Sequence, residues 1–464
     1  MRHQSWLGRA ASIAGIAGAI AAGASFPAGA QPPLPVGLQA LANTTTTGNQ
    51  DESAVAVDPN GNFLVVWRDE FLDGSASAII GRRFSARTGL PLSNEFLINL
   101  STDGDQRNPA IAIADDGRFV VVWEGPDSLS PLTPGIFASL RQANGTAIVA
   151  EFPVNTGTSG VQRRPAVAMQ PGGGFFIVWQ DNTPIGFNPL PDENIAGRLY
   201  PANFPATPPG NPFQINTGTI AGDQEQPAVA PIPSTGGWLA GWQGPFSPSL
   251  IPSIFVRVLD AGGSGTIEQV VNSSSNAVQR SHVALATNSQ GDAVAVWEAP
   301  DASFRGIFAR RIDAGVPSAA EEQVNLTTSL DEREPSVAID QRGAFVTVWV
   351  VASPTAFGAW EETPEGSPII IQGRKKSTGG RFAELDDSLT PPADSEFRVD
   401  TSGSAFVDPW VTTEPRGNFV VAWQGTDPTD PQGNGVFYRG FRDAVFADGF
   451  ETQNTTRWSA TFPP

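Results

Sequence analysis

The sequence predicts an all-β protein, a seven-bladed β-propeller of four-stranded antiparallel blades. A glycine turn that leads into an apolar strand ending in tryptophan occurs seven times, at intervals of 52 to 74 residues. No helical periodicity is found after residue 30, and a strand at about 36–43 precedes the first copy. A four-stranded sheet cannot bury both of its faces alone, so the copies must stack, and radial stacking of seven gives a ring. The seven tryptophans are Trp67, Trp123, Trp179, Trp242, Trp297, Trp349 and Trp423.

Each copy is expected to have an outer strand that ends in asparagine and continues into a Thr/Ser/Gly loop. Phe96–Asn99 and Phe152–Asn155 are clear examples. These strand ends number seven, as the tryptophans do, but the first of them precedes the first tryptophan. They are Asn43, Asn99, Asn155, Asn216, Asn272, Asn325 and, as a variant, Asp400.

An inner strand and a tryptophan strand follow, joined by a tight turn. Pro109–Ile113 alternates small and branched residues, which is typical of a strand, and Asp115–Gly117 has the chemistry of a β-hairpin turn. The continuous apolar run of Phe63–Trp67 predicts a strand buried on both faces. Its tryptophan is therefore expected to pack between neighbouring sheets, which argues against a sugar-stacking surface made of these tryptophans.

A third strand carries the pattern Ile-x-x-Arg in most copies. We expect its arginines to lie on blade surfaces and pair with acids. In one copy Ile136 is followed by Ser139 where the arginine should be. The arginines are Arg82, Arg198, Arg257, Arg310, Arg374 and, in a close variant, Arg439.

The two ends of the repeat array predict how the ring closes. The last copy has strands at Trp410–Thr413, Phe419–Trp423 and Val436–Phe441 but lacks its own fourth strand. The N-terminal strand Val36–Asn43 is expected to complete this last blade. An open solenoid is the alternative, and it would leave both ends unpaired. The propeller is predicted over residues 36–442, with an insertion after Trp349.

The N-terminus is predicted to be a secretory signal peptide over residues 1–30. Arg2 and Arg9 supply positive charge, Ala10–Ala24 the apolar stretch, and Ala28–Ala30 the small residues before a cleavage site. A retained membrane anchor is the alternative, but the apolar run is short and rich in Ala and Gly. We expect a secreted, periplasmic or cell-surface protein. A Pro-rich lead (31–35) precedes the propeller, and a short tail (443–464) follows it.

Composition excludes several classes of function. Removal of residues 1–30 changes the net charge from −19 to −21, and so acidic a chain should repel nucleic acid and anionic membrane surfaces. The absence of cysteine excludes disulfides, thiolate metal sites and cysteine nucleophiles. We expect a monomer with no membrane span after signal removal, no metal and no cofactor. Asp103–Asp105 falls short of the EF-hand pattern, and no P-loop or dinucleotide fingerprint occurs.

Asn155–Ala168 is the clearest copy of a longer pattern, Asn-Thr-x-Thr-x-Gly-x-Gln, followed by Gly-x-Phe-Val-Val-x-Trp and Ile-x-x-Arg. This pattern resembles repeats of large exported proteobacterial surface proteins, often grouped with the hemolysin-type, calcium-associated class. The resemblance covers roughly residues 36–442 and implies a surface protein without an agreed activity. Nonapeptide calcium repeats are absent, so calcium binding is not implied. The tail, Phe446–Glu451 with Trp458-Ser459, is similar to a C-terminal sequence of exported gammaproteobacterial proteins, which implies sorting or surface handling.

Polar residues near the inner strands are the candidate ligand-binding residues. In a propeller these positions gather at one mouth of the central channel, where a polar ring could hold an acidic or sugar ligand. The alternative is that the amides satisfy loop backbone groups in every blade. The candidate glutamines before the inner strands are Gln50, Gln106, Gln162, Gln224 and Gln279. The arginines that directly follow this glutamine position are Arg107, Arg163, Arg280 and Arg333, and the acids that directly follow a repeat tryptophan are Glu124 and Glu298.

No catalytic residue is predicted. His282 is the only histidine left after signal removal, and we align it with Pro109 and Pro165, which favours a structural role over a catalytic triad. The leading interpretation is an exported, non-enzymatic binding or interaction module for a glycan or a protein. The alternative is a carbohydrate-active enzyme, a glycosidase or polysaccharide lyase, with carboxylates at the channel mouth. Carboxylates within about 10 Å in a deep asymmetric pocket would favour the enzyme.

Overall fold

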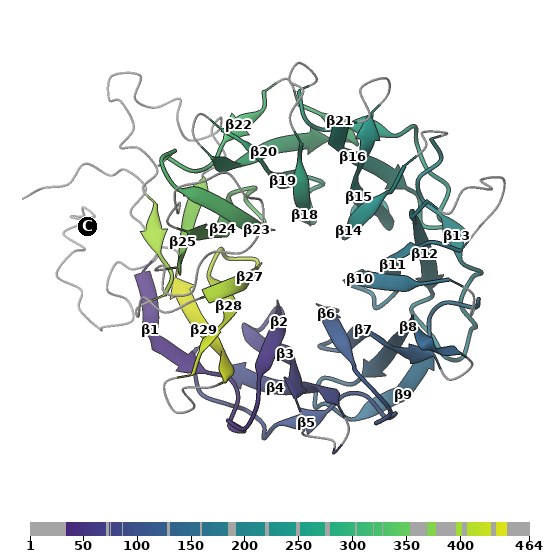
Figure 1. Ribbon diagram of the computed structural model, residues 1–464, viewed down its shortest axis with the longest axis vertical. Helices are drawn as coiled ribbons and strands as arrows, with labels where there is room; N and C mark the ends of the chain where they lie inside the picture. The colour runs from purple at the N-terminus through teal and green to yellow at the C-terminus, as the bar shows by residue number, and fades with distance from the viewer. Residues whose placement is uncertain are drawn as a thin grey trace, which may run out of the picture.

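The computed structural model describes residues 34–442, apart from 71–73, 75, 86, 128–129, 158–159, 184–191, 219–221, 247–250, 274–278, 302–303, 319, 327, 353–368, 377–395, 401–405 and 428–432. The predicted signal peptide and C-terminal tail lie outside the described residues, as does most of the insertion after Trp349. Seven antiparallel sheets are arranged radially around a central axis, and in each sheet the strand that precedes the tryptophan strand is innermost (Figure 1). The predicted all-β, seven-bladed propeller is confirmed.

The blades follow one another along the chain, and the first four have four strands each. Blade 1 is β2 (Gln50–Val57), β3 (Asn62–Glu70), β4 (Ser77–Ser85) and β5 (Phe96–Leu97). Blade 2 is β6 (Arg107–Ile113), β7 (Phe119–Asp127), β8 (Ser130–Arg141) and β9 (Ala147–Pro153). Blade 3 is β10 (Gln162–Met169), β11 (Phe175–Asp181), β12 (Asn194–Tyr200) and β13 (Phe213–Gln214). Blade 4 is β14 (Glu225–Ile232), β15 (Gly237–Phe246), β16 (Ile251–Leu259) and β17 (Gln269–Val270).

The remaining blades keep this plan with two variations. The outer position of blade 5 is split into two short strands, and blade 7 takes its outer strand from the N-terminus. Blade 5 is β18 (Ser281–Thr287), β19 (Ala293–Pro300), β20 (Arg305–Asp313), β21 (Val316–Pro317) and β22 (Glu322–Gln323). Blade 6 is β23 (Asp331–Ile339), β24 (Phe345–Ala352), β25 (Ile369–Lys376) and β26 (Phe397–Arg398). Blade 7 is β27 (Phe406–Thr413), β28 (Phe419–Thr426), β29 (Asn434–Arg442) and β1 (Leu34–Leu41).

The ring closes as the sequence predicts. β1 pairs with β29, Leu41 lying opposite Phe437, so the two ends of the propeller share one sheet (Figure 1). Asn43 Oδ1 then accepts a hydrogen bond from the backbone N–H of Val436 at 2.9 Å. An open solenoid is excluded, because the strand that it would leave unpaired completes the last blade.

The residue that ends each outer strand has the same function in all seven blades. Its side-chain oxygen accepts the backbone N–H of the third strand at 2.7 to 2.9 Å, as Asn99 does from Ile79. Asp400, which lacks the amide, does this equally well because only an acceptor is needed. The repeated asparagine is therefore a structural feature of the strand end.

The Ile-x-x-Arg arginines differ from the prediction that they pair with acids on blade surfaces. Each guanidinium is half-buried and donates to a main-chain carbonyl of the preceding blade, as Arg82 does to Ala42 at 2.8 Å. That carbonyl lies at the end of an outer strand, where a long side chain from the next blade can reach it. Blade 2 has Ser139 at this position, and Arg141 makes the equivalent bond to Ile98 at 2.9 Å. The others are Arg198, Arg257, Arg310, Arg374 and Arg439.

The seven repeat tryptophans form the core between blades, as predicted. Each is at most 1% exposed. Trp123 of blade 2, for example, lies in one cluster with Val66 and Ile79 of blade 1. Burial of so large a side chain stabilises each interface by about 1.5–3 kcal/mol.

Replacement of Asn43 by alanine tests the closure. The buried N–H of Val436 would lose its acceptor, so we expect the free energy of unfolding to fall by about 1–3 kcal/mol. Urea denaturation of Asn43→Ala measures this loss. Asn60→Ala, at an exposed position in the first hairpin turn, is the control and should change stability by less than about 0.5 kcal/mol. Equal effects of the two substitutions would contradict the proposed function of Asn43.

Candidate functional site

One residue in the inner strand of every blade adopts a left-handed backbone conformation, with φ between 49° and 53°. At each of these positions the pairing with the second strand shifts, which marks a β-bulge. A left-handed residue other than glycine is strained, and such residues concentrate at functional sites. We call these seven residues the bulge ring: Glu52, Asn108, Arg164, Gln226, His282, Glu334 and Asp408.

The bulge ring is held by a circle of hydrogen bonds between blades. The backbone N–H of each ring residue donates to a side-chain oxygen of the preceding blade at 2.5 to 3.0 Å. In blades 1, 4 and 6 the acceptor is the ring residue itself, as when Glu334 accepts from Asp408. In blades 2, 3, 5 and 7 the acceptor is the residue after the repeat tryptophan: Glu124, Gln180, Glu298 and Gln424.

The identity of the acceptor in each blade shows which ring residues stabilise the next blade. Glu52, Gln226 and Glu334 each hold the next bulge. Asn108, Arg164, His282 and Asp408 do not, because the residue behind the tryptophan holds the next bulge in their blades. Three of these four instead contact the acceptor of their own blade: Asn108 donates to Glu124, Asp408 accepts from Gln424, and His282 Nδ1 lies 3.1 Å from Glu298.

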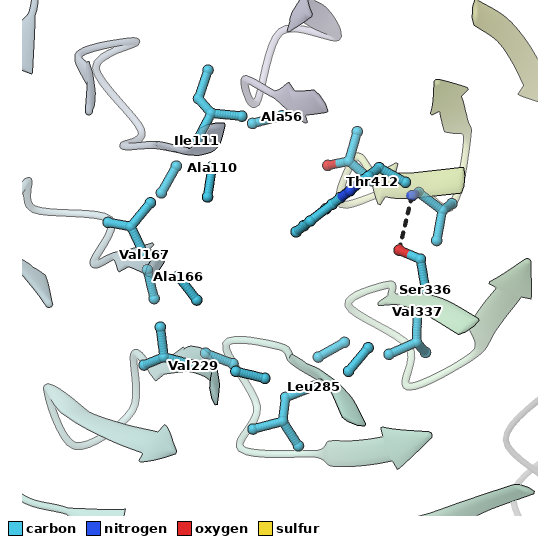
Figure 2. Close-up of a pocket in the computed structure, with 18 of the residues that line it drawn as sticks. Ala56, Ala110, Ile111, Ala166, Val167, Val229, Leu285, Ser336, Val337 and Thr412 are labelled. Atoms are coloured by element: carbon cyan, nitrogen blue, oxygen red, sulfur yellow. Dashed lines mark hydrogen bonds between the residues drawn. The ribbon is translucent and has the colours of Figure 1, made fainter. Parts of the chain in front are cut away.

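The bulge ring surrounds one end of a central cavity of about 680 Å³, lined by the inner strands of all seven blades. Below the ring the wall is largely apolar, as Figure 2 shows for Ile111, Val167, Val229 and Leu285. The Ser336 hydroxyl accepts a hydrogen bond from Val411 N–H at 3.1 Å across neighbouring strands (Figure 2). The channel thus joins a polar mouth to an apolar interior.

The mouth is electrostatically asymmetric. Glu334, Asp408 and Glu52 are consecutive around the ring, and we call them the acidic sector. Gln424 links two of them, since it donates to Asp408 Oδ2 at 2.8 Å and accepts from Glu52 N–H. Among the described residues no cationic group lies within 4 Å of Glu334 or Asp408, and Arg68 Nε is 3.8 Å from Glu52 Oε1. The other side of the ring carries Asn108, Arg164, Gln226 and His282.

Burial and the crowding of negative charge raise pKa values in the acidic sector. Burial, and then the charges of Glu334 and Glu52, raise the pKa of Asp408 to about 7. Burial also raises the pKa of Glu52, although the hydrogen bond from Asn108 N–H and the nearby Arg68 oppose this. Near neutral pH Asp408 therefore exchanges between the acid and the carboxylate.

His282 belongs to the bulge ring, which corrects its alignment with the prolines. Val283 occupies the proline position, so His282 aligns with Arg164 rather than with Pro165. Its Nδ1 lies 3.1 Å from Glu298 Oε1. Burial alone would lower the pKa of His282, but the hydrogen bond and charge of Glu298 raise it. The sequence comparison failed here because the proline that marks the other copies is missing.

The glutamines predicted to form a polar ring lie behind the mouth. Gln50, Gln106, Gln162 and Gln224 are at most 6% exposed. Gln106 Nε2 donates to the carbonyl of Asp103, and Gln50 bonds the loop before it, as the structural alternative required. In blade 5 the buried position belongs to Arg280, and Gln279 is an exposed loop residue.

The other predicted site residues divide into two groups. Glu124 and Glu298 lie directly beneath the bulge ring, where they hold Arg164 and Glu334. Three predicted arginines instead precede ring residues and form ion pairs with local acids: Arg107 with Asp105, Arg163 with Glu193 and Arg333 with Asp331.

Trp410 is the residue at the mouth that sequence reasoning missed. It lines the cavity and is 41% exposed, unlike the seven repeat tryptophans. It stands two residues after Asp408 and pairs with Ala422. A column comparison of the copies would have found it, because the other blades have small residues here: Ala54, Ala110, Ala166, Ala228, Ala284 and Ser336.

The fold defines the chain as a seven-bladed propeller with an asymmetric channel mouth. In the described part of the chain, no three His, Cys, Asp or Glu side chains are grouped to hold a metal. Nor do those residues include a helix long and apolar enough to cross a membrane.

No family model and no curated protein matches the chain, so the resemblance to exported proteobacterial repeats stays a prediction. Several solved structures are similar to the chain at low sequence identity and low TM-score. A protein of unknown function from Dyadobacter fermentans is 11% identical with a TM-score of 0.49, over 89% of this chain and 100% of that one. A Hadza microbial sialidase is 11% identical with a TM-score of 0.44, over 78% of this chain and 73% of that one. The polysaccharide lyase Uly1 is 9% identical with a TM-score of 0.45, over 89% of this chain and 99% of that one. Similarity this low carries no statement about activity.

Asp408→Asn should change how stability depends on pH. The native pKa of about 7 lies above the usual value near 3.9, so the folded state binds more protons between these values and stability falls as pH rises through them. Asparagine removes this effect and tolerates the left-handed backbone, as Asn108 does. We expect the Tm of Asp408→Asn minus that of the wild type to increase from pH 5 to pH 8. A difference that is constant with pH would contradict the shifted pKa.

Proposed function

We propose that the protein is a non-enzymatic binding module that takes a glycan ligand at the channel mouth. One observation carries this proposal: the backbone of the bulge ring repeats seven times, whereas its side chains include acids, amides, an arginine and a histidine. Only Glu52, Gln226 and Glu334 serve as acceptors for the next bulge, so the variety of the other four side chains is not set by that duty. Varied polar side chains around a concave mouth are what a specific ligand site requires.

The chemistry of the mouth favours a glycan over a protein surface. Carboxylates, amides and a guanidinium offer the acceptors and donors that bind hydroxyl groups. The Arg164 side chain has no hydrogen bond or ion pair with another described residue, so it is available to a ligand. The opening leads into a channel, which a sugar chain end can enter and a flat protein surface cannot. The predicted signal peptide agrees with an extracytoplasmic ligand.

A hydrolytic enzyme is the second candidate, and one feature favours it. Asp408, with a pKa of about 7, lies beside the carboxylates of Glu334 and Glu52. An acid that is partly protonated near neutral pH, beside an ionised carboxylate, is the pair that glycoside hydrolysis uses. The reaction would need Asp408 to protonate the glycosidic oxygen and a neighbouring carboxylate to activate water or attack the sugar.

Arg164→Asn tests binding at the mouth. This change removes the available guanidinium but keeps the residue that blade 2 has at the same position, so the fold should persist. A glycan array identifies ligands, and calorimetry with one of them should show affinity reduced about tenfold or more, because hydrogen bonds to charged groups contribute about 1.5–3 kcal/mol. Arg416→Ala, an equal charge change in the exposed turn between β27 and β28, is the control and should leave affinity unchanged. Equal affinity of both variants would contradict the site.

Incubation of the same glycans with the protein decides between module and enzyme. The binding module should release no new reducing ends or unsaturated products over long incubation. Product formation by the wild type that Asp408→Asn abolishes would establish the enzyme instead. Asp115→Asn, at an exposed hairpin turn distant from the bulge ring, controls for loss of a carboxylate.

A further inference from the structure

We propose that the acidic sector and Trp410 together form a subsite for a protonated amine, such as the amino group of an amino sugar. The inference rests on the proposed function, since it names the chemical class of ligand that the same mouth selects. It concerns blades 6, 7 and 1, which contribute Glu334, Asp408 with Trp410, and Glu52.

Trp410 places an exposed indole in the channel. It follows Asp408 by two residues on β27, so it lies about 7 Å deeper in the channel. Alanine or serine stands here in the other blades, and the exposed indole is therefore an addition that the fold does not need. Unlike the repeat tryptophans, it leaves 41% of its surface to the cavity. An indole face binds a sugar ring by its apolar side, or a cation within about 6 Å.

The acidic sector has more negative charge than nearby positive charge. Its three carboxylates are neighbours, yet only Glu52 has a cation within 4 Å, the 3.8 Å contact with Arg68 in the described structure. Arg68 is itself paired with Asp51 at 2.7 Å. Like charges without a counter-ion oppose one another, and this repulsion adds to burial in raising the pKa of Asp408. A ligand ammonium would supply the missing positive charge.

The opposite side of the mouth makes the subsite directional. Arg164 lies there with an available guanidinium, and His282 and Arg305 approach the buried Glu298. These groups disfavour an amine on their side and leave the acidic sector as its place. A metal ion fits less well, because no three acidic or histidine side chains among the described residues converge on one point. An ammonium needs only hydrogen-bond acceptors around it and accepts an aromatic face.

The blades themselves provide substitutions that should fold. Trp410→Ala restores the residue found in five other blades, and Asp408→Asn copies Asn108. Asp408 does not hold a neighbouring bulge, since Gln424 does so in blade 7. Asp115→Asn removes the same charge from an exposed turn outside the mouth and is the matched control for non-specific attraction to this acidic protein.

Calorimetry at pH 7, where the amines of the first probe are partly protonated, tests the proposal with a trimer of β-linked glucosamine and with its fully N-acetylated counterpart. The two probes differ in charge but share length and ring structure. We expect the amine form to bind at least about tenfold more tightly. Asp408→Asn and Trp410→Ala should each weaken the amine form by about tenfold, and Asp115→Asn should not. Hydrogen bonds to charged groups and cation–π contacts have this magnitude.

The possible failures are distinguishable. Equal binding of the two trimers, weakened alike by Trp410→Ala, would overturn the amine subsite and leave glycan binding at the mouth intact. Amine binding that Asp115→Asn reduces as much as Asp408→Asn would be general attraction to an acidic surface and would also overturn it. The proposed function itself fails if Arg164→Asn changes the binding of neither trimer and of no glycan on the array.

Discussion

Each blade of this propeller can bury its two faces only against its neighbours, and the rest of the structure depends on that constraint. Three circles of contacts meet it at different radii. Arginines bond the outer strand of the preceding blade, tryptophans fill the interfaces, and the bulge-ring N–H groups bond across the inner edge. Every circle must pass from blade 7 to blade 1, and the arginine circle does so through Ala42, which directly follows β1. Pairing of the two chain ends therefore supplies the carbonyl that closes the outermost circle.

The inner circle also explains how a repeated frame accommodates a variable site. A bulge needs one acceptor from the blade before it, and this chain supplies that acceptor in either of two positions. Where Val350 follows the tryptophan and cannot accept, the ring residue Glu334 does so. Where Gln424 accepts, the ring residue Asp408 is not needed as the acceptor for the next bulge. In each blade, either the ring residue or the residue after the tryptophan must therefore accept the next bulge N–H. The other of these two residues is not needed as an acceptor.

Periodicity was sufficient to predict the fold. The strand types, the tryptophan core and the closure by an N-terminal strand all follow from local patterns and from counting the copies. Roles that depend on the neighbouring blade could not be read in the same way. The Ile-x-x-Arg arginines bond carbonyls about 40 residues away in sequence, and no local pattern identifies such partners. His282 was misaligned because Val283 replaces the proline that marks its register.

The residues at the channel mouth could be predicted from the sequence only in part. Glu124 and Glu298 lie next to the bulge ring, where they accept from the backbone of Arg164 and Glu334. Gln50, Gln106, Gln162 and Gln224 are buried behind the mouth, and burial between a loop and a strand depends on packing that spacing does not reveal. In the aligned columns Trp410 is the one large residue at a position where the other blades have alanine or serine. Departures from a repeat are more informative about function than the repeat itself.

The position of the acidic sector links the site to the closure. Glu334, Asp408 and Glu52 come from blades 6, 7 and 1, so the sector spans the junction where the chain ends meet. Glu52 is more than 350 residues from Asp408 in sequence, and only the closed ring brings them together. A ligand held between them would bind the closed ring and not an opened one. By mass action its binding free energy would then add to the stability of the closure. Ring integrity and ligand binding would be coupled through Gln424, the side chain that bonds both Asp408 and the backbone of Glu52.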